Sequence, residues 1–288
     1  MLFSKIPAVS GSYVIPDMAI ELGEMIRHFQ MQGGEVYAMK TETQEYAAFI
    51  GIMKSHIEGI LEIGMMHTVA NSEDLTLNDR FLEHILSEEN AQALRCQLTD
   101  ESSCGLVEGL GFSHESTIFG SDLLEQDTDE SLISVAGKAF DYLTPDQITQ
   151  LRALVVDGAK EESEYTGQPY HTPDEQLDQL IERIRNAQDD VFVKVVDEQL
   201  IAALAIDPNA QYPIISTVLV HPEHRLQGIG RALINKAVKE YAREDTLVLA
   251  VVLEATPHLK EFFTNSGLIP VARIYRYLRL EGVEGESA

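Results

Sequence analysis

Apolar residues recur along the C-terminal half of the chain with the spacings of helices and strands. Ile148, Leu151 and Leu154 share one helical face, and Thr144-Pro145 just before them has the sequence of a helix start. A polar segment then precedes a second helix, expected over 177–184. The pattern after it predicts, in order, strands over 191–196, 200–206 and 213–220, a helix over 232–241, a strand over 246–253, a helix over 257–265 and a strand over 271–280.

Two of these strands have patterns that also predict their burial. Residues 246–253 are almost all apolar, which is typical of a strand covered on both faces. In the last strand Arg273, Tyr275, Tyr277 and Arg279 alternate with Ile274 and Leu278, which predicts a half-solvated strand.

The N-terminal half follows the same plan. Its pattern predicts, in order, a helix over 18–32, strands over 35–39, 46–53 and 60–69, a helix over 79–86, a strand over 93–98, a helix over 103–109 and a strand over 114–119. The segment 104–112 parallels 258–268, with Gly111 opposite Gly267. We therefore predict an α/β fold with mixed sheets in two similar domains, residues 1–125 and 126–288, joined by the acidic segment 121–131.

The net charge and the cysteine content limit the kinds of molecule that this protein is expected to bind and where it is expected to act. The net charge of −26 repels nucleic acid and anionic membranes, and it favours a cationic acceptor over an anionic one. No apolar run approaches the length of a membrane span, and the N-terminus does not resemble a signal peptide. Cys96 and Cys104 are expected to be reduced thiols, so the sequence predicts a cytoplasmic protein.

The stretch from Val218 to Leu233, VLVHPEHRLQGIGRAL, carries the strongest functional signal. A strand, a glycine-bearing turn and a helix N-terminus follow one another here, and free N–H groups at a helix N-terminus bind phosphates. Gly228 and Gly230 allow close approach of the backbone, and Arg225 and Arg231 add positive charge. A P-loop is excluded because Arg231-Ala232 follows the last glycine, and a dinucleotide fingerprint would need a third glycine.

The motif resembles motif A of the GNAT superfamily, the acyl-CoA-dependent N-acyltransferases. Val220-His221-Pro222 matches the end of the family's strand, and Arg225-Leu226-Gln227-Gly228-Ile229-Gly230 matches its turn. The resemblance covers about residues 140–280. The repeat suggests a tandem GNAT chain with a degenerate N-terminal copy, because 70–76 there has no glycine, no arginine and two acids.

The resemblance implies acetyl-CoA as co-substrate and an amine as acceptor. Val218, Leu219 and Val220 would bind the pantetheine arm, and Leu226 to Arg231 the pyrophosphate. Thr256 and Phe263 take the places of a family Asn and a family Tyr at the following helix. Thr256 is expected to cap that helix or to contact CoA, and Phe263 to pack against CoA or the core.

Candidates for proton transfer are few. Glu254, which ends the strand over 246–253, is the best candidate for the general base, and Tyr275 on the last strand is a second catalytic candidate. Tyr165, Tyr170 and His171 would line an acceptor pocket made acidic by Glu161, Glu162 and Glu164. His221 and His224 have metal-ligand spacing but no third ligand nearby, so no metal is expected.

The leading hypothesis is an N-acetyltransferase in which a small-molecule or peptide amine attacks acetyl-CoA directly. The alternative is a non-catalytic acyl-CoA-binding regulatory protein, which the absence of a Tyr at position 263 favours. A longer acyl donor is a third alternative. GNAT proteins often pair, so the resemblance is compatible with a homodimer.

Overall fold

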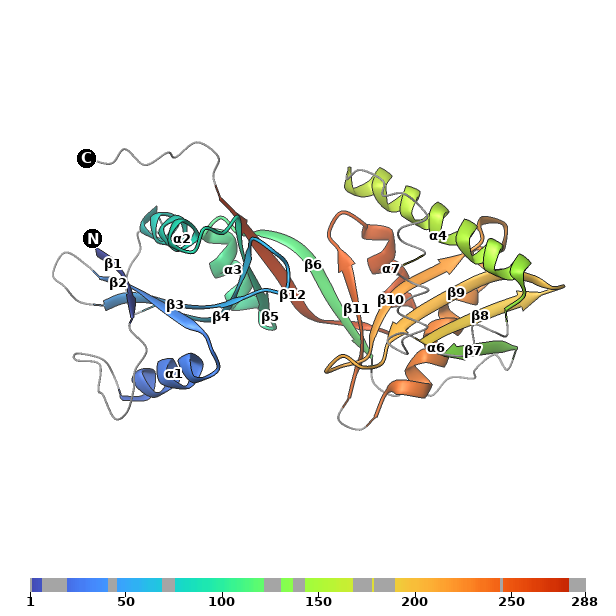
Figure 1. Ribbon diagram of the computed structural model, residues 1–288, viewed down its shortest axis with the longest axis horizontal. Coiled ribbons are helices and arrows are strands. Elements are labelled where there is room, and N and C mark those ends of the chain that lie inside the picture. The colour runs from blue at the N-terminus through green and yellow to red at the C-terminus, as the bar shows by residue number, and fades with distance from the viewer. Residues whose placement is uncertain are drawn as a thin grey trace. The chain divides into compact units, whose positions relative to one another are not determined.

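The computed structural model describes residues 2–6, 20–40, 46–68, 76–121, 131–136, 143–167, 178, 190–243 and 246–279. They fall into two compact units, which we describe separately (Figure 1). Unit 1 comprises Met1–Glu115 with Ala272–Ala288, and unit 2 comprises Ser116–Val271. The domain boundary expected near residue 125 stays a prediction.

Unit 1 is a mixed sheet with helices on both faces. Its strands follow the order β1-β2-β3-β4-β5-β12, in which β4 and β5 are parallel and the other pairs are antiparallel. The strands are β1 (Leu2–Ile6), β2 (Glu35–Lys40), β3 (Tyr46–Lys54), β4 (Ile60–Thr68), β5 (Ala93–Leu98) and β12 (Ile269–Leu278). The helices are α1 (Ile20–Met31), α2 (Thr76–Glu88) and α3 (Glu101–Gly109).

Unit 2 repeats this topology. Its order is β7-β8-β9-β10-β11-β6, in which β10 and β11 are parallel and the other pairs are antiparallel. The strands are β6 (Ser113–Ser121), β7 (Leu132–Ala136), β8 (Asp190–Val196), β9 (Gln199–Asp207), β10 (Ile214–Val220) and β11 (Val248–Leu253). The helices are α4 (Pro145–Thr166), α6 (Ile229–Tyr241) and α7 (Pro257–Asn265). The predicted mixed-sheet α/β fold with two similar domains is confirmed.

The two halves of the sequence exchange their last strands. β12, at the end of the second half, pairs with β5 in unit 1, and β6, at the end of the first half, pairs with β11 in unit 2. Arg273–Leu278 lie opposite Ala93–Leu98, and Ser116–Ser121 lie opposite Val248–Leu253. Each unit therefore completes its sheet with a strand from the other half of the sequence.

The helix ends also repeat. Helices α3 and α7 both finish on a left-handed glycine, Gly111 at φ 84° and Gly267 at φ 91°. In each, the N–H after the glycine bonds a carbonyl five residues back: Phe112 N–H donates to Val107 O, and Leu268 N–H donates to Phe263 O, both at 3.1 Å. The glycine correspondence seen in the sequence is thus a correspondence of structure.

Local signals placed the start of α4 correctly. The Thr144 hydroxyl accepts from Gln147 N–H, and the Gln147 side chain accepts from Thr144 N–H, which completes a capping box ahead of Pro145. The helix then continues through Thr166, so Tyr165 lies in α4 and not, as expected, in the polar segment between two helices. Of the predicted helix over 177–184 the structure describes residue 178 alone, which is helical. The linker residues 122–130, the segment 69–75, Tyr170 and His171 lie outside the described residues.

Two burial predictions are wrong. Strand β11 is covered on one face only: Val248, Ala250 and Val252 are buried in the core with α6 and α7, whereas Val251 is 46% exposed. Strand β12 is not half-solvated, because Tyr275 and Tyr277 are buried in the core of unit 1. The exchange of β12 into unit 1 explains this, since the strand there packs against residues of α2 and α3.

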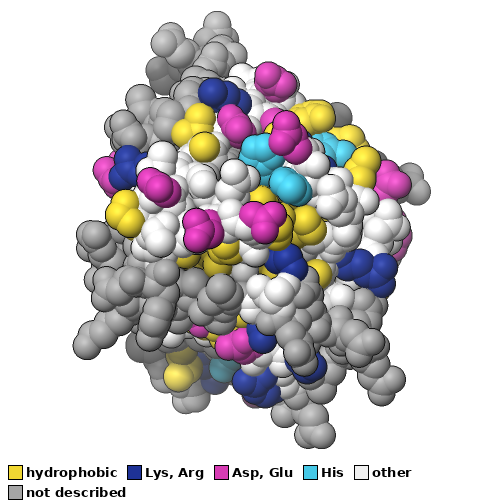
Figure 2. Space-filling model, turned by 90° about the vertical axis from the view of Figure 1, so that its right-hand side faces the viewer, with side chains coloured by type: hydrophobic (Ala, Val, Ile, Leu, Met, Phe, Trp, Pro, Cys, Tyr) yellow, Lys and Arg dark blue, Asp and Glu magenta, His cyan; other side chains and the backbone are white. Residues whose placement is uncertain are grey.

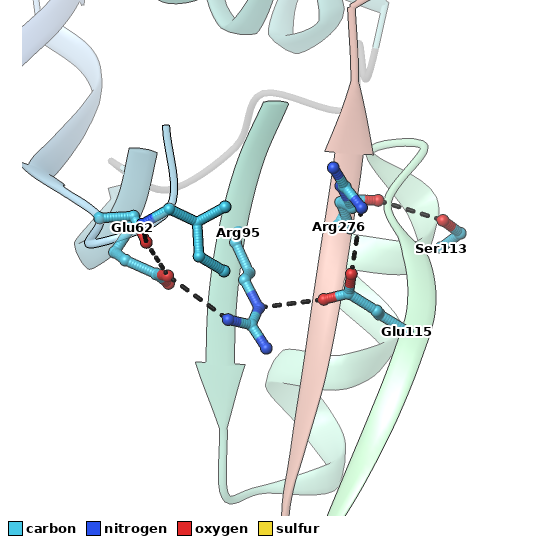
Figure 3. A network of polar contacts seen from close by, with 7 residues as sticks. Glu62, Arg95, Ser113, Glu115 and Arg276 are labelled. Carbon is cyan, nitrogen blue, oxygen red and sulfur yellow. Dashed lines mark hydrogen bonds and ion pairs between the residues drawn. The ribbon is translucent and has the colours of Figure 1, made fainter. Parts of the chain in front are cut away.

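A chain of charged side chains crosses the strands of unit 1 that flank the exchanged β12 (Figure 3). Arg95 on β5 lies 3.6 Å from Glu62 on β4 and 3.0 Å from Glu115 on β6. Arg276 on β12 donates to Glu115 at 3.2 Å, and Ser113 Oγ donates to the Arg276 carbonyl at 3.2 Å. Side-chain contacts therefore join β12 to its neighbouring strands in addition to the backbone pairing.

Candidate functional site

The parallel strands of unit 2 part at a β-bulge. Ile214 and Ile215 of β10 pair with Leu249 and Ala250 of β11, and the pairing ends there. The register with β9 shifts at the same point, between Ile215 and Thr217, which leaves Ser216 as the extra residue. Beyond the bulge β10 pairs with β9 on one side only. Its other edge, where the pairing with β11 has ended, is open.

Backbone alternation shows which groups this open edge presents. His221 N–H donates to Ile201 O at 2.8 Å, so the backbone of His221 faces β9. Val220 O accepts from Arg225 Nε at 3.0 Å, on the other side. Because successive residues of a strand direct their N–H and C=O to opposite sides, Val218 and Val220 direct theirs toward the open edge.

The turn after β10 leads into a helix with free N–H groups. A short 3-10 helix (Pro222–His224) is followed by Leu226, fully exposed at φ 61°, and by Gly228, the N-cap of α6, at φ 80°. The first helical bond runs from Ala232 N–H to Gly228 O at 3.0 Å, so the N–H groups just before it have no intrahelical acceptor. The first turn of α6 has no acidic residue, and a Cβ on Gly228 would meet nothing within 4 Å. This end of α6 is suited to bind an anion.

The second glycine of the motif serves packing. A Cβ on Gly230 would lie 3.0 Å from Phe262 Cζ and 3.6 Å from Val220 Cγ2. The absence of a side chain at position 230 therefore lets α7 approach the start of α6 closely.

Helix α4 contributes its last three turns to the same region. The Arg225 guanidinium lies 2.8 Å from Glu161 Oε1, and the Tyr165 ring contacts the His258 ring with centroids 4.3 Å apart. A Cβ on Gly158 would lie 2.6 Å from Leu219 Cδ2, so Gly158 lets Leu219 pack against the helix. Sequence reasoning named Glu161 and Tyr165 but missed Gly158, whose only signal is a glycine inside a helix.

The predicted catalytic residues lie in different units. Glu254 follows β11 in unit 2, is exposed and pairs with Lys260. Tyr275 lies in unit 1, where it is 1% exposed and its hydroxyl donates to Glu108 at 2.8 Å. Burial, reinforced by the hydrogen bond to Glu108, raises the pKa of Tyr275 above its ordinary range. A catalytic role for Tyr275 stays a prediction.

The two residues of the α7 region are buried. Thr256 stands at the N-cap of α7, but its hydroxyl donates to Leu253 O at 2.9 Å and does not cap the helix, so that expectation is wrong. Phe263 belongs to the core of unit 2, where its ring stacks on Phe119 at 6.1 Å. Contacts of Thr256 and Phe263 with CoA stay predictions.

Unit 1 has the same bulge but fills the space beside it. The β4–β5 pairing ends at Ile63 and Cys96, and the register with β3 shifts around Gly64. Phe29 of α1 packs on this bulge: a Cβ on Gly64 would lie 2.7 Å from its ring. In unit 2 the bulge residue is the exposed Ser216, so the two bulges differ in what covers them.

On the visible face of the molecule (Figure 2) the described charged side chains are spread out. On the face shown in Figure 2, acidic side chains are scattered among basic residues and histidines and form no single patch. Within the described residues no group of three His, Cys, Asp or Glu could hold a metal, and no helix is long and apolar enough to span a membrane.

The sequence model of the acetyltransferase (GNAT) domain matches residues 160–275, which include β10, the turn, α6, β11 and α7. Residues 160–275 are therefore a GNAT acetyltransferase domain by sequence. A sequence search of curated proteins finds no match.

Solved structures show where this fold recurs. A GNAT-family acetyltransferase from Colwellia psychrerythraea aligns over 96% of this chain and 99% of its own, with 11% identity and a TM-score of 0.50. A GCN5-related N-acetyltransferase from Sphaerobacter thermophilus aligns over 91% and 87%, with 15% identity and a TM-score of 0.48. A tandem GNAT protein from the clavulanic acid biosynthesis pathway aligns over 86% and 84%, with 12% identity and a TM-score of 0.42. The first of these alignments extends the GNAT fold over both units.

Proposed function

We propose that unit 2 transfers the acetyl group of acetyl-CoA to an amine. One observation carries the proposal: β10 and β11 part at a bulge, and the edge opened there leads to the acid-free N-terminus of α6. An extended amide-bearing arm can pair with such an edge, and a diphosphate can bind at such a helix end. The GNAT family match agrees with this use.

The donor would be held mainly by backbone groups. Val218, Leu219 and Val220 would bind the pantetheine arm, and the N–H groups from Leu226 to Arg231 would bind the pyrophosphate. Thr256 and Phe263 would support this side of the site from α7. Gln227 and Ile229 contribute N–H groups, whereas Arg225 and Arg231 add side-chain charge.

The reaction forms a C–N bond and breaks a C–S bond. The Val218 N–H, beside the bulge, would polarise the thioester carbonyl and stabilise the oxyanion that develops on it. Glu254, directly or through water, would take a proton from the attacking amine, and the departing thiolate would gain one. The transfer needs no metal, because amine, thioester and base suffice.

The acceptor would be a small-molecule or peptide amine. The net charge of −26 and the glutamates of α4 favour a cation near the site. We further propose a cytoplasmic enzyme that acts without nucleic acid or membrane and can pair as a homodimer.

Release of free CoA thiol from acetyl-CoA in the presence of a panel of primary amines tests this function. Glu254→Gln should lower kcat by about 100-fold, since general-base catalysis contributes on this order. Glu261→Gln, an exposed glutamate on α7, is the matched control and should keep the wild-type rate. Acetyl-CoA binding without thiol release by any amine would support the non-catalytic, acyl-CoA-binding alternative instead.

A further inference from the structure

Arg225, the first residue of the motif turn, is bound by groups of β10 and α4. Its Nε donates to the Val220 carbonyl, and its NH1 lies 2.8 Å from Glu161 on α4. A diphosphate bound at the α6 N-terminus would be a second anion for the same guanidinium.

The position of Glu161 is fixed by packing on either side of it along α4. Three residues earlier, Gly158 lies in close contact with Leu219 of β10, and four residues later Tyr165 contacts the ring of His258 of α7. Residues 158, 161 and 165 share one face of the helix. The carboxylate is thus held beside Arg225 by contacts that do not depend on the ion pair.

We propose that Glu161 is an internal competitor of the donor's diphosphate for Arg225. This rests on the proposed function, which supplies the diphosphate. When the donor binds, its diphosphate replaces the Glu161 carboxylate as the partner of Arg225. The attraction lost with Glu161 reduces the net gain from the diphosphate. Glu161 thereby lowers the affinity for the donor.

The expected size of the effect follows from exposure. The Arg225 side chain is 41% exposed and that of Glu161 is 45% exposed. Ion pairs at this exposure change an equilibrium by a factor of about two to five, which is the gain expected when the competitor is removed.

Titration calorimetry of acetyl-CoA into the full chain tests the proposal. Glu161→Gln should bind about two to five times more tightly than wild type. Glu162→Gln, an exposed neighbour on the same helix, removes the same charge without touching Arg225 and should change the affinity by clearly less. In an Arg225→Gln background, Glu161→Gln should have no more effect than the control.

The outcomes separate the two claims. Loss of a merely structural contact would weaken binding, so a gain in affinity is specific to competition. Equal affinities of Glu161→Gln and Glu162→Gln, weaker binding by Glu161→Gln, or an undiminished gain in the Arg225→Gln background would each overturn the proposal while leaving the donor site in place. No binding of acetyl-CoA by the wild type would instead remove the proposed function itself.

Discussion

Arg95 and Arg276 lie directly opposite each other on the neighbouring strands β5 and β12 of unit 1. Like charges in this position repel, and Glu115 compensates by contacting both guanidinium groups, at 3.0 and 3.2 Å. The negative charge of Glu115 on β6 therefore offsets the repulsion between the two arginines and stabilises the pairing of β12 with β5.

Glu115→Gln should lower the stability of unit 1 by about 1–2 kcal/mol, because a 24% exposed carboxylate is removed from between two cations. Native-state hydrogen exchange of β5 and β12 amides measures this. Glu101→Gln is the matched control: it removes an 83% exposed partner of Arg273 on the same strand and should cost under about 0.5 kcal/mol. Equal losses in both variants would show that Glu115 has no bridging role.

The exchange of β12 predicts an asymmetric response to truncation. Ending the chain at Val271 removes Tyr275 and Tyr277 from the core of unit 1. Loss of each large buried side chain costs about 3–5 kcal/mol, which together approaches the stability of a whole domain. Amides of β2, β3 and β5 should then lose their exchange protection, whereas those of β9 and α6 in unit 2 keep theirs. Loss of protection first in unit 2 would contradict the assignment of β12.

The stability of unit 1 should depend on pH through Asp100, the N-cap of α3. Hydrogen bonds from the Ser102 hydroxyl and the Ser103 N–H, at 2.6 and 2.8 Å, lower the pKa of Asp100 from 3.8 to about 2. A carboxyl with a lowered pKa contributes stability that is present above pH 3.8 and is lost as the pH falls toward 2.

The Asp100→Asn variant keeps a capping group that does not titrate in this range. Its stability should lie below that of wild type at neutral pH, and the difference should shrink between pH 4 and 2 as the wild-type carboxylate is protonated. Denaturant unfolding at a series of pH values measures both. A difference independent of pH would show that the ionised carboxylate is not what stabilises the cap.

Local signals predicted most of the elements. The capping box at Thr144, the turn at Gly228 and the helix stops at Gly111 and Gly267 depend on a few neighbouring residues, so they can be read from the sequence. The order of helices and strands follows from periodicity in the same way.

Long-range pairing could not be predicted in this way. The exchange of β6 and β12 depends on partners more than 120 residues apart, and nothing in the pattern of Tyr275 and Tyr277 identifies the strand that they join. Burial followed from that pairing, which is why β12 was expected to be half-solvated. The bulge at Ser216 and the pairing of Arg225 with Glu161 are likewise tertiary features, although the residues of the donor turn itself were found from their spacing.

The most direct test of the account is equilibrium dialysis of labelled acetyl-CoA against two isosteric variants at the α6 N-cap. Asn tolerates the left-handed conformation at position 228, where φ is 80° and a Cβ meets nothing within 4 Å, and Asp adds a negative charge at the same place. Wild type and Gly228→Asn should each bind one acetyl-CoA per chain, and Gly228→Asp should bind none. Equal binding by the Asp and Asn variants would contradict a diphosphate site at this turn.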